Sequence, residues 1–362
     1  MVAVSMEAVS MEAEKKNPYS LALGSDSGQI IGRENLIQPV IDEFASRDHY
    51  NAIRTCTIKG VKGGGKTTLL KNISGHFQKQ RGWICVKLDT EFDMLSELAF
   101  QICRVEELAD WLGDAQIEVV LHGRQVELRR EGEPVWNAGD AAGCMIRVLS
   151  EHGRRVLICV DDMTVNKNMK VFCETFQTYI WKRLPVYLLV AGDSEQAEIL
   201  SKNRSLSSIC GVKIDAGALN RQAMADNYRK VLGVSREDAD SMAALTKGYA
   251  YSFQVLGYWT WMKGSDYKAA LEEHYYSLTE NVYRKMWSGL SWTDQRVIRA
   301  IARAPRKRNK EIRQILGWDT DHYNPYRMRL VRKGIADGAT YGHLYFTLPG
   351  FEAFVLRYVT GA

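Results

Sequence analysis

A glycine-rich segment at residues 60–68 constrains the fold more than any other part of the chain. Its sequence, Gly-Val-Lys-Gly-Gly-Gly-Lys-Thr-Thr, fits the pattern G-x-x-x-x-G-K-[ST]. A β-branched apolar segment (54–59) precedes it, and a segment with helical character (69–77) follows it. A glycine-rich loop in this position can turn backbone N–H groups and the positive end of the helix toward a phosphate. We therefore predict a phosphate-binding loop, because a turn that binds nothing is rare between a strand and a helix of this kind.

The residues of this loop have different expected roles toward ATP. Lys66 is expected to reach the β- and γ-phosphates, and Thr67 to place its hydroxyl on Mg²⁺. The loop residues expected to contact the nucleotide are Gly60, Gly63, Gly64, Gly65, Lys66, Thr67 and Thr68. ATP and Mg²⁺ are therefore the predicted cofactors.

A second motif supplies the acids that such a site requires. Residues 156–160 form a continuous apolar run that ends in Asp161 and Asp162. Asp161 is expected in the Mg²⁺ shell, and Asp162 is expected to orient and deprotonate the attacking water. The alternative is a buried strand that ends in a polar turn. The predicted catalytic residues are thus Lys66, Asp161 and Asp162.

Short apolar strands alternate with helices up to about residue 215, which indicates a doubly wound parallel sheet. The expected strands are 54–59, 82–89, 154–162 and 185–192, and alternation around His122-Gly123 predicts a β-hairpin over 117–129. The expected helices of this part are 35–47, 95–112, 138–152 and 172–183.

The pattern changes after residue 215. Four consecutive helices are expected at 220–232, 235–246, 251–262 and 265–277. Three further helices (290–301, 309–316 and 324–333) and a β-hairpin (335–348) follow them. Three helices and a hairpin are typical of a winged helix-turn-helix.

The C-terminal part carries the basic excess of the chain. The whole chain has a net charge of +5, yet residues 291–362 hold thirteen Lys and Arg against six Asp and Glu, a net of +7. Such asymmetry indicates a polyanionic partner, and duplex DNA is the predicted one. The candidate DNA contacts are Arg306, Lys307, Arg308, Arg327, Arg329, Arg332 and Lys333. The alternative is a winged helix that binds protein and never contacts DNA.

Other features limit the class of protein. The charge-free apolar run at 184–192 is far too short to span a bilayer, and the first residues lack the basic start of a signal peptide. Seven scattered cysteines without a C-x-x-C pair indicate reduced core residues rather than a metal site. A tandem Val-Ser-Met-Glu-Ala repeat within residues 1–16 predicts a disordered tail. We expect a cytoplasmic protein without a membrane partner.

With both nucleotide motifs placed, the chain resembles bacterial and archaeal AAA+/STAND-type P-loop ATP-binding proteins related to the initiator (origin-recognition) ATPases. The resemblance extends from about residue 17 to the end. The matching motifs are Asn17-Pro18-Tyr19, Gly32-Arg33-Glu34, the glycine-rich loop, Asp161-Asp162, Val190-Ala191-Gly192 and Gly248-Tyr249. It implies that Ile31, Gly32 and Arg33 lie near the adenine and that the chain ends in a winged helix.

Three positions depart from that family pattern. Ala250 replaces the proline of the lid motif, Asp162 stands where many relatives have Glu, and Gly192-Asp193 replaces a hydrophobic-proline step. The shorter arm of Asp162 favours slow hydrolysis. Asp193 is a candidate sensor of the γ-phosphate, with a strand-ending turn as the alternative. Arg204 is a candidate arginine finger, with a plain surface role as the alternative.

These observations together predict an α/β fold: an AAA+ type P-loop core with a parallel sheet (17–215), an all-helical lid (216–286) and a winged helix-turn-helix (287–362). The leading hypothesis is a slow ATPase that works as a switch and couples its nucleotide state to DNA binding. The alternative is a non-hydrolysing, nucleotide-dependent scaffold that recruits a protein partner. A homo-oligomer is compatible with either hypothesis. A metabolic P-loop kinase is disfavoured, because such an enzyme does not need a lid followed by a winged helix.

Overall fold

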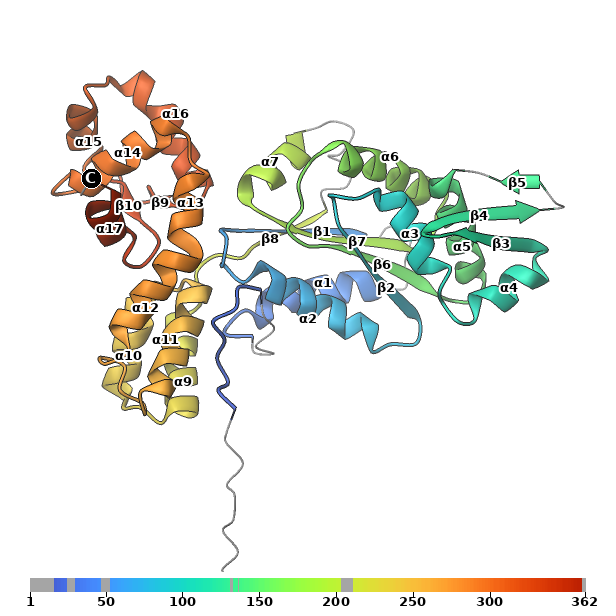
Figure 1. Cartoon of the computed structure of the whole chain (residues 1–362), viewed down its shortest axis with the longest axis horizontal. Coiled ribbons are helices and arrows are strands. Elements are labelled where there is room, and N and C mark those ends of the chain that lie inside the picture. Colours follow the sequence, from blue (N-terminus) through green and yellow to red (C-terminus); the bar gives the residue numbers. More distant parts are fainter. Residues whose placement is uncertain are drawn as a thin grey trace, which may run out of the picture.

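A five-stranded parallel sheet forms the core of the N-terminal part, with the strand order β2-β6-β7-β1-β8 (Figure 1). The computed structural model describes residues 16–24, 30–46, 53–130, 133–135, 137–202 and 211–359. All four strand pairs are parallel. The strands are β1 (Thr55–Lys59), β2 (Trp83–Leu88), β6 (Arg155–Val160), β7 (Val186–Gly192) and β8 (Val212–Asp215). Every residue of β7 is buried, which explains its fully apolar sequence.

Helices cover both faces of this sheet (Figure 1). One face packs against α1 (Glu34–Ala45) and α2 (Lys66–Gln78), whose buried residues share a core with Ile58 of β1. The helices on the other face are α3 (Met94–Ile102), α4 (Leu108–Asp114), α5 (Ala138–Glu151), α6 (Lys167–Trp181) and α7 (Ser194–Lys202). The parallel α/β core predicted from the alternation of strands and helices is confirmed.

The hairpin predicted over 117–129 is confirmed and belongs to a small antiparallel sheet beside the core. Its strands are β3 (Ile117–His122) and β4 (Gln125–Arg130), and β5 (Glu133–Val135) pairs with β4. Leu128 and Val126 point into the core shared with α3 and α5.

The single helix expected over 95–112 is wrong, because the chain forms α3 and α4 with a break between them. Leu98 and Ile102 of α3 and Leu108 and Leu112 of α4 all enter one hydrophobic core. On a continuous helix a separation of ten residues rotates the side chain by about 80° relative to the first, so the two pairs would face different directions. The break lets both pairs be buried.

A purely helical unit follows β8, as predicted. Its helices are α9 (Arg221–Leu232), α10 (Arg236–Leu245), α11 (Ala250–Met262) and α12 (Leu271–Leu278). Asn220 and Ser235 cap α9 and α10 with their side chains. The helix expected from residue 265 begins only at Leu271, since the Asp266 carboxylate accepts hydrogen bonds from the N–H groups of Lys268 and Ala269 and holds a turn there.

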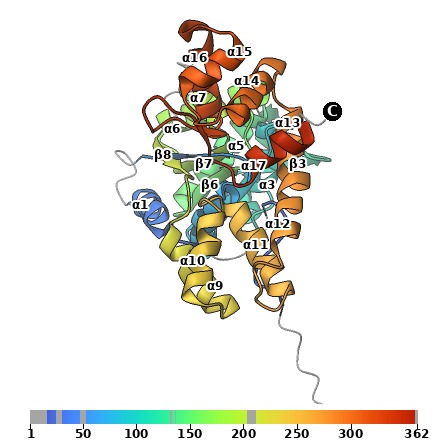
Figure 2. The same ribbon diagram turned by 90° about the vertical axis from the view of Figure 1, so that its left-hand side faces the viewer.

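The chain continues from α12 through a π-helical turn, η1 (Thr279–Tyr283), and α13 (Arg284–Ser288). These pieces form a rod that joins the helical unit to the C-terminal unit (Figures 1 and 2). The C-terminal unit contains α14 (Trp292–Arg303), α15 (Asn309–Leu316), α16 (Thr320–Arg332), β9 (Ala336–Asp337), β10 (Tyr345–Phe346), α17 (Phe351–Phe354) and η2 (Val355–Val359). β9 and β10 pair antiparallel.

The expected start of the third C-terminal helix at residue 324 is wrong. α16 begins at Thr320, because the Asp319 side chain accepts a hydrogen bond from the His322 N–H and caps the helix. Pro325 therefore lies inside the helix, at an exposed position where water can reach the backbone carbonyl that loses its partner.

No helix among the described residues is long and apolar enough to cross a membrane.

A buried histidine makes stability depend on pH. Burial lowers the pKa of His274 to about 4, and its Nε2 lies 2.8 Å from the Ser252 hydroxyl. The unfolded chain binds a proton near the ordinary pKa of 6.5, so the native state is favoured above that pH and loses this contribution as the pH falls toward 4. We expect the free energy of unfolding to fall by about 3 kcal/mol between pH 6.5 and 4 from this group. Urea titrations of wild type and His274→Gln should show a shallower pH dependence in the variant; equal slopes would contradict the assignment.

Candidate functional site

The glycine-rich loop leaves β1 and enters α2 as the sequence predicts. Gly63 and Gly65 have φ angles of +73° and +89°, in the left-handed region that favours glycine. Gly65 is the N-cap of α2, so the first N–H groups of that helix open toward the loop. The Lys66 ammonium folds back and donates to the carbonyl oxygens of Gly60 (3.1 Å) and Val61 (3.0 Å).

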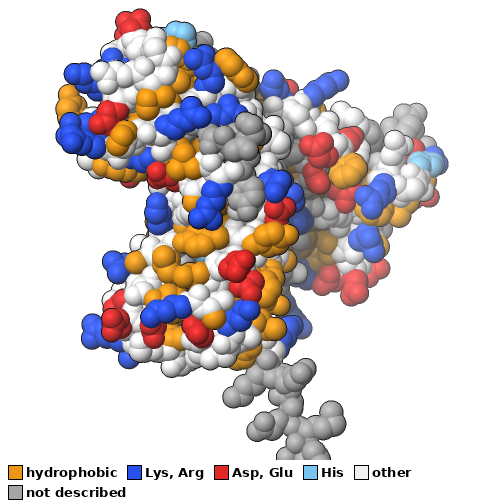
Figure 3. All heavy atoms as spheres, turned by 60° about the vertical axis from the view of Figure 1, so that its left-hand side comes forward, with side chains coloured by type: hydrophobic (Ala, Val, Ile, Leu, Met, Phe, Trp, Pro, Cys, Tyr) orange, Lys and Arg blue, Asp and Glu red, His pale blue; other side chains and the backbone are white. Residues whose placement is uncertain are grey.

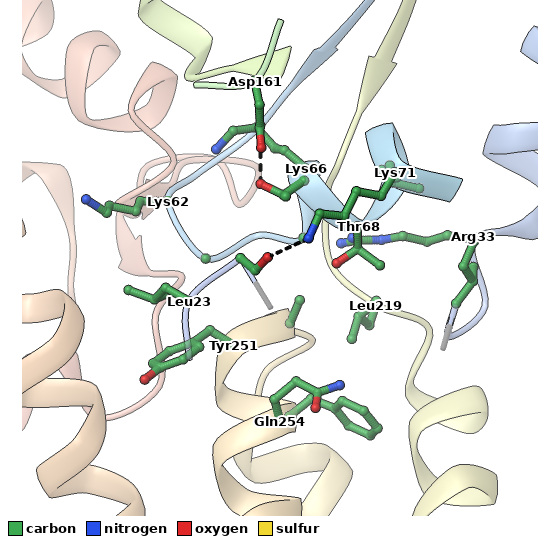
Figure 4. A pocket seen from close by; sticks show the side chains of 18 of the residues that line it. Leu23, Arg33, Lys62, Lys66, Thr68, Lys71, Asp161, Leu219, Tyr251 and Gln254 are labelled. Carbon is green, nitrogen blue, oxygen red and sulfur yellow. Dashed lines mark hydrogen bonds between the residues drawn. The ribbon is translucent and has the colours of Figure 1, made fainter. Parts of the chain in front are cut away.

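Two oxygen ligands suited to a magnesium ion meet at the start of α2. The Thr67 hydroxyl donates to an Asp161 carboxylate oxygen at 3.2 Å, across 94 residues of sequence (Figure 4). The same carboxylate oxygen accepts the Asp162 N–H at 3.0 Å, and Asp162 has a left-handed φ of +52°. The described residues contain no group of three His, Cys, Asp or Glu placed to hold a metal ion. A hydroxyl and one carboxylate fit Mg²⁺, which takes its remaining ligands from water and phosphate.

The electrostatics of the loop favour an anion. Burial lowers the pKa of Lys66, while Asp162, Asp193 and Asp161 oppose that shift. A phosphate next to Lys66 would likewise favour the charged ammonium. The partly desolvated Lys66 thus gains more from a bound phosphate than an exposed lysine would.

Arg33 fixes the loop from behind. Its guanidinium donates to the Gly64 carbonyl at 2.8 Å and also to the carbonyls of Ala216 and Gly217, which lead out of β8. Arg33 is buried, and burial lowers its pKa to about 10, with Asp215 opposing the shift. A Cβ on Gly65 would lie 2.7 Å from the Arg33 side chain, so glycine is required there for space as well as for φ.

The helical unit closes the other side of the loop. The Tyr251 N–H donates to the Gly63 carbonyl at 3.0 Å, and the Tyr249 hydroxyl donates to the Lys62 carbonyl at 2.8 Å. A Cβ on Gly63 would lie 2.3 Å from the Tyr249 hydroxyl. The start of α11, including Ala250, therefore sits directly against the loop despite the missing proline.

These elements enclose a pocket of about 360 Å³ (Figure 4). Its cationic side chains are Arg33, Lys62, Lys66, Lys71 and Lys87, against the two acids Asp161 and Asp162. The apolar part of the wall comes from Leu23, Ile30, Ile31, Leu219 and Phe253. The pocket thus has a cationic side at the loop and an apolar side toward the helical unit.

The structure brings most of the predicted site residues together and leaves some apart. The pocket wall includes Arg33, Gly63, Gly65, Lys66, Thr67, Thr68, Asp161 and Asp162. Gly60 and Gly64 face the back of the loop, and Gly32 packs against Asn220 and Ala223 of α9. Asp193 accepts the Gln196 N–H and caps α7, and Arg204 lies outside the described residues.

Sequence reasoning missed several pocket residues. Lys71 lies about one helical turn after Lys66 and donates to the Gly24 carbonyl at 3.2 Å (Figure 4). Lys71 follows Thr67 by four residues on the same helix, so the two share a helix face, and this spacing could have indicated that Lys71 faces the pocket. Tyr251 and Gln254 come from α11, more than 180 residues from the loop, and no local pattern indicated them.

The predicted DNA contacts are mostly engaged within the chain. Arg329 pairs with the buried Asp294 at 2.7 Å, and Arg327 donates to the Gly338 carbonyl. Lys307 donates to two backbone carbonyls and pairs with Glu352 at 2.6 Å. Among the predicted DNA contacts, Arg306 and Arg308 alone are exposed and form no ion pair with another described residue.

The remaining two, Arg332 and Lys333, contact the core. They pair with Glu198 (2.9 Å) and Glu195 (3.0 Å) of α7. Next to them, a Cβ on Gly334 would lie 2.2 Å from the Val61 side chain of the glycine-rich loop, and Val61 packs against the core of the C-terminal unit. The C-terminal unit therefore rests on the back of the loop.

Comparison with solved structures relates the chain to ATPases through its fold. It is similar to the Walker-type ATPase PABY2304 of Pyrococcus abyssi, with a TM-score of 0.66 at 14% identity, over 94% of this chain and 99% of that one. It is similar to the ORC2 protein of Aeropyrum pernix, with a TM-score of 0.57 at 14% identity, over 92% of this chain and 96% of that one. A family model described as a domain of unknown function (DUF8462) matches residues 280–355. No curated protein matches the chain.

These similarities place the chain in the fold class of the P-loop ATPases with a parallel-sheet core. More specifically, its fold is similar to that of the archaeal Walker-type ATPase and ORC2 structures, with a parallel-sheet core and a helical C-terminal region.

Arg33 offers a test of how the loop is held. Arg33→Met should leave the carbonyls of Gly64 and Gly217 without their buried donor and lower the free energy of unfolding by about 3 kcal/mol. Because the loop would then be less fixed, nucleotide affinity should fall about tenfold or more, measured by calorimetry. Arg33→Lys keeps the charge and loses the fork of donors, so it serves as the control. Its stability and nucleotide affinity should lie between those of wild type and Arg33→Met. If Arg33→Met kept wild-type stability and nucleotide affinity, the proposed role of Arg33 in holding the loop would be refuted.

Proposed function

We propose that this protein is an ATP- and Mg²⁺-dependent molecular switch with slow ATPase activity. The observation that carries the proposal is the Thr67–Asp161 pair at the foot of a pocket lined with cations and closed by α11. The pocket volume of about 360 Å³ lies within the range of small-molecule sites. The similar ORC2 structure is a complex with ADPNP and ADP, which supports the same ligand class.

Each residue has a definite part in this proposal. Lys66 would leave the carbonyls of Gly60 and Val61 and neutralise the β- and γ-phosphates. Thr67 and Asp161 would hold Mg²⁺, which neutralises developing charge on the phosphates. Asp162, exposed beside them, would orient and deprotonate the attacking water. The apolar wall of Ile31, Leu219 and Phe253 would receive the adenine.

The first test separates binding from hydrolysis. Lys66→Ala should weaken binding of an ATP analogue by at least about a hundredfold, because it removes a partly desolvated charge from the phosphates. Asp162→Asn should bind ATP with near wild-type affinity and lose phosphate release. Calorimetry and a phosphate-release assay measure the two effects. Unchanged binding in Lys66→Ala would overturn the site assignment.

The contact between the loop and the C-terminal unit supports a route for switching. When Lys66 turns to a phosphate, the Val61 carbonyl loses one of its two donors and keeps the Gly64 N–H, and Val61 is the residue that packs on Gly334. Lys247 of the helical unit also donates to the Phe346 carbonyl in β10. We propose that nucleotide binding shifts the C-terminal unit, a winged helix-turn-helix that binds DNA.

The ion pairs on α7 hold the unit in its present position under this proposal. The double variant Glu195→Gln/Glu198→Gln removes both pairs; each is partly exposed and contributes at most about 1 kcal/mol. We expect faster amide hydrogen exchange at the end of α16 and cleavage by trypsin at Arg332 or Lys333. The control Glu106→Gln/Glu118→Gln removes the same charge from exposed positions elsewhere on the core. Equal protection in both variants would show that the ion pairs do not restrain the unit.

A second function is favoured by one observation. The cations of α16 serve internal contacts, which fits a nucleotide-dependent scaffold whose C-terminal unit recruits a protein. The absence of any DNA binding by wild type, with nucleotide binding intact, would support this alternative.

A further inference from the structure

The exposed face of α16 lacks the cations that a DNA-reading helix needs for phosphates. Its exposed residues are Thr320, Asp321, His322, Asn324, Pro325, Met328 and Arg332. Arg332 is the one cation among them, and it is paired with Glu198. Phosphate contacts supply most of the affinity of DNA-binding proteins, so α16 is poorly equipped to provide it.

The turn between α14 and α15 has the opposite character. Arg303, Arg306, Arg308 and Lys310 are all exposed within eight residues. None of these four side chains forms an ion pair within the described part of the chain. The nearby acid, Glu311, accepts a hydrogen bond from the Arg306 backbone N–H. Figure 3 shows the C-terminal unit as the upper lobe, where blue Lys and Arg side chains outnumber red acids.

Lys307 makes this turn rigid. It has a left-handed φ of +56°, and its ammonium is held inside by the carbonyls of Ile301 and Ala302 and by Glu352. This partly buried lysine anchors the turn from within, while its neighbours Arg306 and Arg308 stay exposed at the surface. The exposed cations are therefore pre-positioned, which lowers the entropic cost of binding.

The hairpin of β9 and β10 adds aromatic rings to the same surface. Residues 342–344 pair with the turn: the Asn309 N–H donates to the Gly342 carbonyl, and the Leu344 N–H donates to the Lys307 carbonyl. Tyr341 is 99% exposed at the tip of the hairpin, and Tyr345 stacks on His343 with a centroid distance of 5.7 Å. An aromatic ring fully open to water beside four free cations matches the stacking platforms of proteins that bind single strands.

We propose that this turn–hairpin surface (Arg303, Arg306, Arg308, Lys310, Tyr341 and Tyr345) binds single-stranded DNA. The cations contact successive phosphates, and Tyr341 stacks on an unpaired base. The inference rests on the proposed function, since it identifies where and in which form the DNA is bound. It moves the binding surface from α16 to the α14–α15 turn and the hairpin.

The test measures binding of a fluorescent oligothymidylate of about 20 nucleotides, and of a duplex of equal length, at several salt concentrations with the full chain. The variant Arg306→Gln/Arg308→Gln/Lys310→Gln should raise the Kd for the single strand tenfold or more. It should also flatten the slope of log K against log salt by about 2, because three phosphate contacts are lost. The matched control Arg229→Gln/Lys230→Gln/Arg236→Gln removes the same charge from exposed positions of the helical unit and should bind like wild type. Tyr341→Ala should raise the Kd for the single strand about tenfold and barely affect the duplex.

The possible results distinguish a wrong binding surface from a wrong proposed function. If wild type binds DNA and the turn variant binds equally well, while Asn324→Ala on α16 weakens binding, this surface is wrong and the proposed function stands. If Tyr341→Ala changes the Kd for neither the single strand nor the duplex, the proposed stacking contact is wrong. If wild type binds neither the single strand nor the duplex while ATP binding is intact, both this inference and the DNA-binding part of the proposed function fail. Because Tyr341 touches little else, its variant should keep the wild-type melting temperature.

Discussion

The crowding around the glycine-rich loop is the constraint on which the rest of the structure depends. Three parts of the chain meet this loop so closely that side chains would not fit. Tyr249 of the helical unit lies where a Cβ on Gly63 would be, and Arg33 lies where a Cβ on Gly65 would be. Val61 of the loop, in turn, reaches Gly334 of the C-terminal unit. Glycine therefore serves two purposes here: it frees the backbone to face a phosphate, and it lets three units approach one another at that point.

This crowding has a consequence for regulation. Well-packed contacts do not deform continuously, so a change at the loop is expected to move neighbouring units as bodies. The polar contacts among the described residues that join these units to the core include the Tyr249 and Tyr251 hydrogen bonds to the loop and the ion pairs of Arg332 and Lys333 with α7. The α7 ion pairs are partly exposed and hold the C-terminal unit only weakly, as the proposed nucleotide-dependent switch requires.

The C-terminal unit shows why a basic composition does not by itself define a binding surface. Arg329, Arg327 and Lys307 stabilise the unit through Asp294, the Gly338 carbonyl and Glu352. A cation that satisfies a buried acid or a carbonyl is poorly available to phosphates. Cations that remain exposed without an ion pair gather at a short turn next to an aromatic hairpin, and the proposed DNA-binding surface depends on that smaller set.

The sequence determined the glycine-rich loop between a strand and a helix, the strand that ends in Asp161 and Asp162, the parallel core and the helical character after residue 215. These features are local: a glycine spacing, an apolar run or a helical period follows from neighbouring residues alone. The split of the expected helix at 95–112 and the start of α16 at Thr320 were decided by the shared core around Leu98 and Leu112 and by the Asp319 cap. Only the tertiary structure decided that Arg33 braces the loop, that Tyr251 and Gln254 line the pocket, and that Arg332 faces Glu198. Those partners lie far apart in sequence, and their meeting depends on how the units pack, which no local pattern records.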